Sequence, residues 1–115
     1  MKRGEIYVVK FGKKYNSEFG KTRPALIIQN DIANRNIDKV AFQGVTLLPL
    51  TTNITGGSVR VLIDKRDNLL QRSEICINEI CTLDKSRISL EKVLTTLSQK
   101  EMQEVTFKLQ KHLGI

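Results

Sequence analysis

Arg23 is the residue whose position in this sequence best suits it to bind a phosphate. It directly precedes Pro24 and the wholly apolar run 25–28 (ALII), which has the pattern of a strand buried on both faces. Pro24 cannot donate a ladder hydrogen bond, so we expect it at the start of that strand, with Arg23 at the edge. An arginine there has a fixed direction of approach, and its planar guanidinium matches phosphate oxygens. The alternative is a surface ion pair, for example with Glu18.

Two adjacent threonines form a second candidate group. Thr51 and Thr52 follow Pro49 and Leu50 at the end of another predicted strand, 40–50. Their position beside a predicted strand mirrors that of Arg23. The residue types alone favour an ordinary turn or strand end instead.

Positive charge is concentrated near the N-terminus. The net charge is +7, and residues 1–23 hold seven Lys or Arg against two Glu, which is +5 of that total. The loop that follows the first predicted strand also contains Glu18 and Phe19. A basic loop with an aromatic ring is a common means of holding single-stranded RNA, although most charged loops are only solvated. The lysines predicted to contact such a polyanion are Lys13, Lys14 and Lys21.

The usual equipment of metal-dependent and serine hydrolases is missing from the sequence. No GxSxG, Walker A or HExxH motif occurs, and the sole histidine, His112, falls in the last turn of a predicted helix. Cys76 and Cys81 have a spacing that fits neither a redox pair nor a zinc site, so we expect buried, reduced thiols. We therefore expect no metal and no cofactor.

The elements that must position these residues are short strands. We predict strands at 6–11, 25–28, 40–50, 59–64 and 74–82, the third of them bulged at Gly44, and a polar turn at 34–38, for which one turn of helix is the alternative. The connections are too short for crossover helices, so the strands should form one strongly bent antiparallel sheet or small barrel. At 115 residues the chain is expected to be a single domain, 1–115.

One longer helix should close the barrel. Ser98 and Glu101 have the spacing of a capping box, and Gly114 stands where a helix would end. The apolar residues of this helix should face the core: Met102, Val105, Leu109 and Leu113. No signal peptide or membrane span is evident, which predicts a cytoplasmic protein.

Five segments of the chain, in order, resemble the MazF/PemK/Kid family of toxins. They are RGEIYVV at 3–9, SEFGKTRPALIIQND at 17–31, LPLTTNI at 48–54, SEICINEICTLDKSRI at 73–88 and EMQEVTFKLQKHLGI at 101–115. The second segment, with its Arg-Pro pair and Gln-Asn-Asp end, is the most specific. The resemblance covers nearly the whole chain.

This resemblance implies a mainly β fold, the SH3-like barrel of the CcdB/MazF type, with a C-terminal α-helix. It implies the toxin of a type II toxin–antitoxin system, a homodimer that binds single-stranded RNA across its interface. Such enzymes are metal-independent, sequence-specific endoribonucleases that leave 2′,3′-cyclic phosphate and 5′-hydroxyl ends.

Site roles follow from the matching motifs. Arg23 and Thr51 are the implied catalytic residues, Thr52 is a weaker neighbour, and Glu18 matches a loop glutamate that positions RNA or catalytic groups. Phe19 replaces a frequent glutamine of the family and either stacks on a base or anchors the loop. In related toxins with another catalytic set, an Arg and an Asp of a central strand take part. Arg60 and Asp64 do not match their spacing.

Partners and rival functions also follow from the resemblance. A cognate antitoxin with an acidic, disordered tail should bind the basic RNA groove and hide the site. One alternative is a CcdB-like gyrase poison, but that protein ends in Trp-Gly-Ile, whereas this chain has no tryptophan. The other alternative is a non-catalytic RNA-binding barrel.

Overall fold

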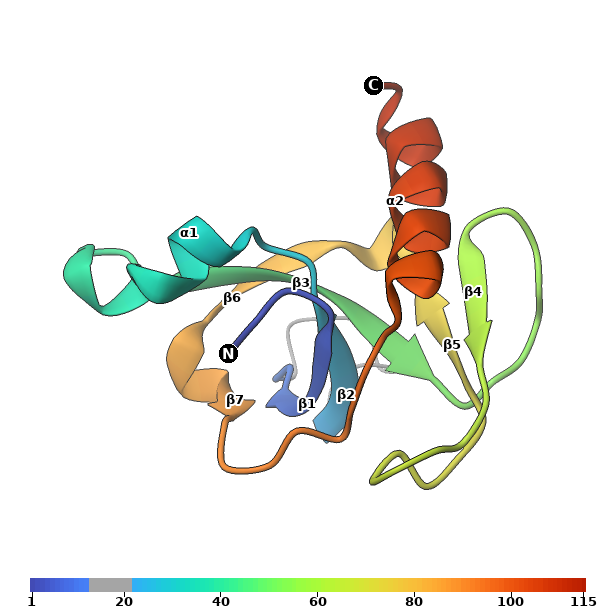
Figure 1. The fold of residues 1–115 in the computed structure, drawn as a ribbon, viewed down its shortest axis with the longest axis horizontal. Coiled ribbons are helices and arrows are strands. Elements are labelled where there is room, and N and C mark those ends of the chain that lie inside the picture. The colour runs from blue at the N-terminus through green and yellow to red at the C-terminus, as the bar shows by residue number, and fades with distance from the viewer. Residues whose placement is uncertain (13–21) are drawn as a thin grey trace.

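The fold is a bent antiparallel sheet with one long helix at its end. The structure of the protein, a computed structural model, describes residues 1–12 and 22–115. In this part of the chain eight strands pair in the order β4-β5-β3-β2-β1-β7, with β6 also on β3 and β8 on β1 (Figure 1). The strands are β1 (Glu5–Lys10), β2 (Thr22–Ile27), β3 (Gly44–Thr51), β4 (Arg60–Ile63), β5 (Ser73–Cys76), β6 (Cys81–Asp84), β7 (Ile88–Ser89) and β8 (Thr95–Thr96).

The longest strand, β3, organises the sheet because it pairs with three others. Its last residues pair with β5, its first residues pair with β6, and its middle pairs with β2. Two clusters of buried apolar side chains form the hydrophobic core, and each contains residues from β1, β2 and β3. The predicted fold class, a mainly β barrel with a C-terminal helix, is confirmed.

The predicted strand 40–50 is wrong in its first half. β3 begins at Gly44, and residues 40–43 form a turn before it. A Cβ atom placed on Gly44 would lie 2.3 Å from the ring of Phe42 and 2.7 Å from Thr82 Cγ2. Phe42 therefore folds back over Gly44, and the glycine starts the strand instead of forming a bulge within it.

The predicted strand 74–82 is two strands separated by a 3₁₀ turn, η2 (Ile77–Glu79). Leu50 pairs with Ile75, whereas Leu47 pairs with Cys81, so three steps along β3 correspond to six along its partner. The turn takes up this change of register. Cys76 is buried as predicted, but Cys81 is only half-buried, and both residues are thiols.

A short helical arm lies between β2 and β3. It consists of α1 (Asp31–Arg35) and the 3₁₀ turn η1 (Ile37–Lys39), close to the predicted turn at 34–38. Asn30 caps α1, since its side chain accepts a hydrogen bond of 2.8 Å from the amide of Ala33.

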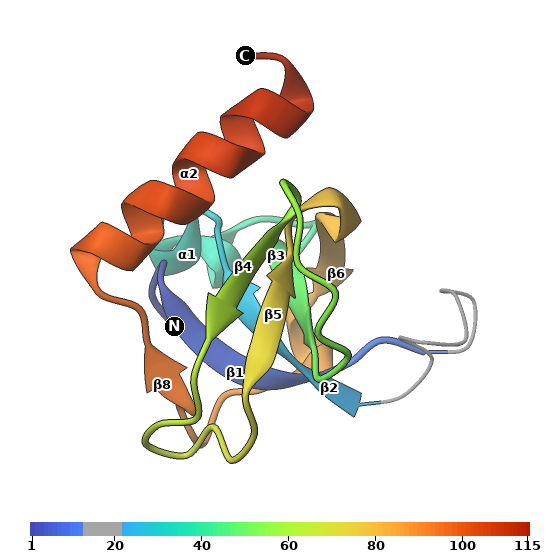
Figure 2. The same ribbon diagram turned by 90° about the vertical axis from the view of Figure 1, so that its right-hand side faces the viewer.

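Helix α2 (Gln99–Leu113) confirms the predicted cap. Ser98 Oγ accepts from the Glu101 amide at 3.1 Å, and Glu101 Oε1 accepts from the Ser98 amide at 2.8 Å. Val105 is fully buried, but Leu113 is 47% exposed, so the apolar stripe does not run to the end of the helix. The last turns extend beyond the barrel, where no strand is left to cover them (Figures 1 and 2). Within the described ranges, no helix is long and apolar enough to cross a membrane.

A candidate phosphodiester-binding cavity at the end of the β2–β3 ladder

Two prolines end the pairing of β2 with β3. The ladder runs from the Ile27–Leu47 pair to the Ala25–Pro49 pair and stops there, one residue from Pro24. Proline has no N–H to donate, so neither strand can continue the ladder regularly at this end. The prediction that Pro24 begins its strand is wrong: β2 begins at Thr22, and Pro24 pairs with Val8 of β1. Pro24 is tolerated inside β2 because, among the described residues, only β1 pairs with this half of the strand.

Arg23 and Thr51 lie where this ladder has ended. Continuing the antiparallel alignment by two residues beyond the Ala25–Pro49 pair brings Arg23 opposite Thr51. Residues paired in this way direct their side chains to the same face of a sheet. Both residues line one cavity of about 480 Å³, and Thr52 lines it too. The structure thus brings together the three predicted site residues that it describes.

Three parts of the chain form the cavity wall. The strand ends contribute Arg23, which is half-buried, and Thr51, which is 2% exposed. The loop between β4 and β5 forms a second wall, and Lys92 lies in the segment between β7 and β8. The lining residues are Val8, Thr22, Arg23, Pro24, Leu50, Thr51, Thr52, Asn68, Leu69, Leu70, Gln71, Ser73, Lys92 and Leu94.

The hydroxyl of Thr51 is fixed by the loop that follows it. Thr51 Oγ1 accepts a hydrogen bond of 3.1 Å from the Asn53 amide. This is a local side-chain-to-backbone turn of the kind that threonine readily forms. A hydroxyl that accepts from the backbone keeps its own proton for donation to a ligand or neighbour.

Glu74 holds the remainder of that loop. Its carboxylate accepts from the amides of Thr55 at 3.0 Å and Gly56 at 2.9 Å, and from Arg60 Nη1 at 3.0 Å. Burial raises the pKa of Glu74, but the two amide hydrogen bonds and the charge of Arg60 outweigh burial and leave that pKa below its usual range. Arg60 is therefore engaged in holding this loop through Glu74. Asp64 pairs with Arg72 at 3.2 Å.

The β4–β5 loop is tied to the start of α2 by Arg66. Its guanidinium donates to the two oxygens of Glu101 at 2.7 and 2.9 Å, to Thr95 Oγ1 at 3.1 Å and to the Thr96 carbonyl at 3.1 Å. Hydrogen bonding by Arg66 lowers the pKa of Glu101. Thr95 in turn donates to Asp67 Oδ2 at 2.6 Å, at a left-handed residue with φ of 51°. This network fixes the part of the cavity lining that the β4–β5 loop contributes.

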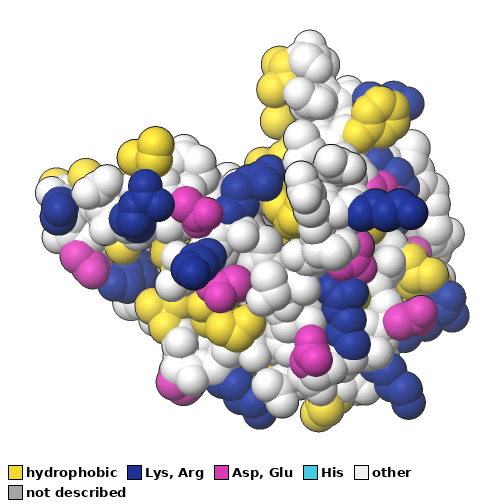
Figure 3. Space-filling model, in the orientation of Figure 1, with side chains coloured by type: hydrophobic (Ala, Val, Ile, Leu, Met, Phe, Trp, Pro, Cys, Tyr) yellow, Lys and Arg dark blue, Asp and Glu magenta, His cyan; other side chains and the backbone are white. Residues whose placement is uncertain are grey.

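Several predicted site residues lie outside the described residues: Lys13, Lys14, Glu18, Phe19 and Lys21. Of the other basic residues near the N-terminus, Arg3 is used elsewhere, because it donates to the Ile28 carbonyl at 3.1 Å and to Thr106 at 3.2 Å. Positive charge is spread on the face shown in Figure 3, where Lys and Arg side chains alternate with acidic ones. His112 is exposed in the last turn of α2 and does not line the cavity.

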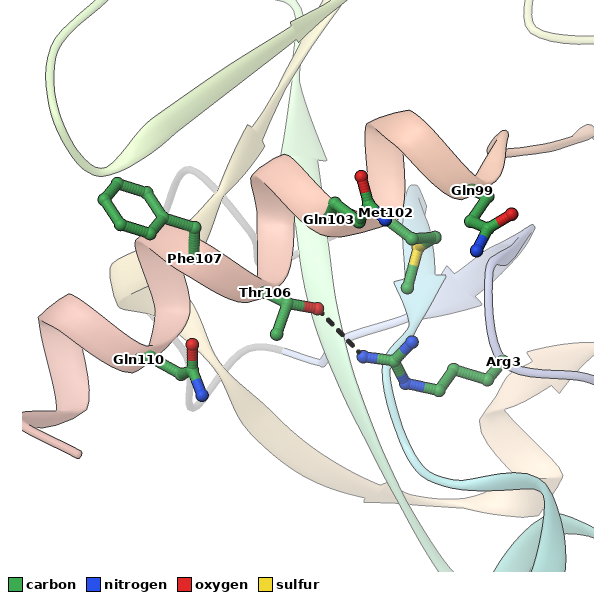
Figure 4. A pocket seen from close by; sticks show the side chains of 7 residues that line it. All are labelled: Arg3, Gln99, Met102, Gln103, Thr106, Phe107 and Gln110. Atoms are coloured by element: carbon green, nitrogen blue, oxygen red, sulfur yellow. Dashed lines mark hydrogen bonds between the residues drawn. The ribbon is translucent and has the colours of Figure 1, made fainter.

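A second, smaller hollow of about 290 Å³ lies between Arg3 and one face of α2 (Figure 4). Its lining is mainly amide and apolar, and the guanidinium of Arg3 reaches across to Thr106 on the helix. The ring of Phe107 at its rim has the ammonium of Lys111 at 5.5 Å from its centre. Neither of the described candidate catalytic residues, Arg23 and Thr51, lines this hollow. Its lining residues are Arg3, Gln99, Met102, Gln103, Thr106, Phe107 and Gln110.

Sequence reasoning missed the β4–β5 wall and the buried carboxylate of Glu74. Residues 68–71 form an irregular turn without a motif, and only an apolar pair, Leu69-Leu70, in a polar stretch distinguishes them. Glu74 carries a clearer indication, since it directly precedes the apolar run 75–77 of a predicted strand, where a charged group needs partners. Lys92 has no distinguishing feature in the sequence.

The fold and the cavity define a class: a small antiparallel barrel with a terminal helix and a cavity lined by an arginine and two threonines. Comparison with known proteins agrees with this class. Residues 2–113 match the model of the family described as PemK-like, MazF-like toxin of type II toxin-antitoxin system. Endoribonuclease MazF of Staphylococcus saprophyticus is 35% identical to the chain. The alignment covers 100% of this chain and 92% of that relative.

Solved structures share the fold at lower identity. MazF of Deinococcus radiodurans has a TM-score of 0.76 at 23% identity and covers 100% of this chain and 97% of its own. Toxin MazF-mt6 of Mycobacterium tuberculosis has a TM-score of 0.77 at 17% identity, over 96% of this chain and 97% of its own. A mycobacterial endoribonuclease, solved in complex with its cognate antitoxin, has a TM-score of 0.75 at 23% identity, over 100% and 96%. The chain belongs to the family of PemK-like, MazF-like toxins of type II toxin–antitoxin systems.

Proposed function

We propose that this MazF-family toxin is a metal-independent endoribonuclease that cuts single-stranded RNA at short sequence motifs. The cut leaves a 2′,3′-cyclic phosphate and a 5′-hydroxyl. The observation that carries the proposal is the convergence of Arg23 and Thr51, from two strands, on one cavity of about 480 Å³. A cavity of this size is within the range of small-ligand sites. The name and 35% identity of the staphylococcal relative support the same activity.

The reaction needs alignment and charge stabilisation. The RNA's own 2′-oxygen forms a bond to phosphorus, and the bond from phosphorus to the 5′-oxygen of the next nucleotide breaks. One proton leaves the 2′-hydroxyl, and another is delivered to the departing oxygen. Holding the nucleophile in line removes much of the entropic barrier, and fixed donors stabilise the developing negative charge. No redox step is involved.

Arg23 suits the developing charge on the phosphorane. A guanidinium stays charged at neutral pH and can donate two parallel hydrogen bonds to non-bridging oxygens. Thr51, held by the Asn53 amide, is placed to donate a hydrogen bond to one of the same oxygens or to orient the 2′-hydroxyl. Thr52 and Lys92 line the same cavity and would bind neighbouring phosphate oxygens.

We assign the acceptor of the 2′-proton to Glu18. Among the described residues that line the cavity there is no carboxylate and no imidazole. Glu18 is the candidate base that the sequence places in the loop before Arg23. Replacing Glu18 by glutamine should lower the cleavage rate and remove the acidic limb of its pH profile, with RNA binding retained. An unchanged pH profile would reject this assignment.

The test of the function uses the purified protein and a long, defined single-stranded RNA in excess EDTA. Three proteins are compared: the natural chain, Arg23→Ala and Arg35→Ala. Arg35 lies exposed in α1 and does not line the cavity, so replacing it by alanine removes the same positive charge at a distant place. We expect discrete cuts with cyclic phosphate ends, kept in Arg35→Ala and slowed at least ~100-fold in Arg23→Ala. If folded, antitoxin-free protein leaves the RNA intact, the nuclease proposal fails, and gyrase inhibition and plain RNA binding are tested next.

The functional unit is proposed to be a homodimer inhibited by a cognate antitoxin. An acidic, disordered tail would compete with RNA for Arg23 and Lys92, since both cations line the cavity. Light scattering tests the dimer. Titration with an acidic tail peptide, at low and high salt, tests the competition: its affinity should fall steeply with salt. An affinity that does not depend on salt would contradict the electrostatic account.

A further inference from the structure

The β4–β5 loop presents an exposed apolar side chain to the cavity. Leu69 is 3% exposed and anchors the loop in the core, whereas the next residue, Leu70, is 81% exposed. Both line the cavity that contains Arg23 and Thr51. A leucine side chain this exposed contributes little hydrophobic stabilisation to the folded protein, but it can cover the face of a planar ring. Gln71, also exposed, follows it on the same wall.

This wall is held rigidly although it is a loop. Arg66 donates four hydrogen bonds across to Thr95, Thr96 and Glu101. The Asn68 amide donates to the Leu94 carbonyl at 2.9 Å, and its side chain donates to the Val93 carbonyl at 3.3 Å. Leu70 and Gln71 are therefore displayed by a fixed frame, which is what sequence discrimination requires.

The chemistry of the wall fits a nucleobase. Single-stranded RNA is read by apolar or aromatic cover of the base face together with hydrogen bonds to the base edge. A glutamine side chain carries a donor and an acceptor side by side, so it can match an edge with the complementary pair. Phosphate groups would lie near Arg23 and Lys92, and a base beside the cut bond would then reach Leu70 and Gln71, the uncharged residues of the β4–β5 loop that line the same cavity.

We propose that Leu70 and Gln71 form the pocket for one RNA base next to the cleaved bond, and that they determine the base preferred at this position. The proposal rests on the proposed ribonuclease function. Leu70 covers the face of the base, and Gln71 binds its edge. Arg66 acts as a positioning residue through Glu101 and does not touch the RNA.

The experiment maps all cut sites in a random-sequence RNA pool by sequencing the new 5′-hydroxyl ends. Leu70→Ala, Gln71→Ala and Gln71→Glu are compared with the natural protein. Gln103→Ala serves as the matched control, because Gln103 is an exposed glutamine that lines only the other hollow. We expect base preference to relax at one position in Leu70→Ala and Gln71→Ala, with an about tenfold or greater loss of kcat/KM on the best motif.

Gln71→Glu separates base reading from a structural role. A carboxylate only accepts hydrogen bonds, so the preferred base at that same position should change to one that offers donors. Mere loosening of the loop would lower activity without selecting a new base. Thermal unfolding of each variant should match that of Gln103→Ala, because both mutated side chains are exposed.

The outcomes that overturn the proposal are distinct from failure of the enzyme. If the natural protein cuts RNA and all variants keep its motif at every position, the base pocket is wrong and the function stands. The same holds if the variants keep the motif but lose inhibition by an acidic antitoxin peptide, since the wall would then serve the antitoxin. If the natural protein does not cut RNA, the proposed function and this pocket fail together.

Discussion

Thr51 pairs with Glu74 in the β3–β5 ladder, and the two residues hold the same loop at its start and at its middle. Thr51 begins the loop and binds the Asn53 amide, while the carboxylate of Glu74 binds the amides of Thr55 and Gly56. The geometry of the candidate catalytic hydroxyl thus depends on a buried carboxylate that does not itself line the cavity.

Replacing Glu74 by glutamine should loosen this loop. Glutamine is nearly isosteric but can no longer accept hydrogen bonds at both ends, and it leaves Arg60 without its charged partner. We expect a loss of about 2 kcal/mol in the free energy of unfolding, measured by urea denaturation. Cleavage should also slow, chiefly in kcat. Stability equal to that of the natural protein would show that the carboxylate is not required.

Acid should destabilise the natural protein more than Glu74→Gln. The pKa of Glu74 is lowered from 4.5 in the folded protein, so the folded state favours the ionised form. This contribution is fully present above about pH 4.5 and is lost as the pH falls through the lower folded-state pKa. The difference in free energy of unfolding between the two proteins should therefore shrink steadily below pH 4.5. Glu101 and Asp31 also have lowered pKa values, but they are common to both proteins and cancel.

The strand positions followed from the sequence where a local run of apolar or alternating residues marks the strand. Apolar residues at 25–28 and the alternation at 59–64 gave β2 and β4 to within a few residues. The failures at 40–43 and at 77–79 have a shared cause: tertiary packing. Phe42 folds over Gly44, and η2 absorbs a change of register along β3. Neither feature has a local sequence pattern.

Thr51→Val and Thr51→Ser form a matched pair that isolates the hydroxyl. Thr51 is 2% exposed, so valine fits its space but removes the acceptor of the Asn53 amide. We expect valine to lower the cleavage rate at least ~10-fold and stability by about 1 kcal/mol. Serine keeps the hydroxyl and should retain most of the activity. Equal cleavage rates for the two variants would show that the hydroxyl of Thr51 has no part in the mechanism.

The candidate site was predictable only in part, for a physical reason. Arg23 directly precedes Pro24 and Thr51 lies two residues after Pro49, and the family motifs mark both. That they share one cavity depends on the register of β2 against β3, which local sequence does not specify. Leu70 and Gln71 were missed because their position depends on Arg66 reaching Glu101, 35 residues away in the chain.

Cys81 should react slowly with thiol reagents in the folded protein. Burial, followed by the charge of Glu79, raises the pKa of its thiol to about 11. The thiolate is the reactive form, so at pH 8 we expect reaction with a disulfide reagent to be about 10- to 100-fold slower than in denaturant. Cys76 is fully buried and should react only on unfolding. Rapid labelling of Cys81 under native conditions would contradict this environment.

Glu101→Gln should separate the two tasks of this residue. A glutamine at position 101 still accepts a hydrogen bond from the Ser98 amide through its side-chain oxygen, so the capping box and α2 are kept. It cannot hold both guanidinium donors of Arg66, which now reach the carboxylate at 2.7 and 2.9 Å. We expect a stability loss of about 1 kcal/mol and unchanged helix content by circular dichroism.

The β4–β5 loop should exchange its amide hydrogens faster in Glu101→Gln, beginning at Asn68 and Leu69, whose amides bind the carbonyls of Leu94 and Arg66. Serine-to-alanine replacement at Ser98 is the converse control, because it removes the cap and leaves Arg66 its partner. If Glu101→Gln leaves exchange in the loop unchanged, the ion pair does not hold this wall, and the anchoring falls to Asn68.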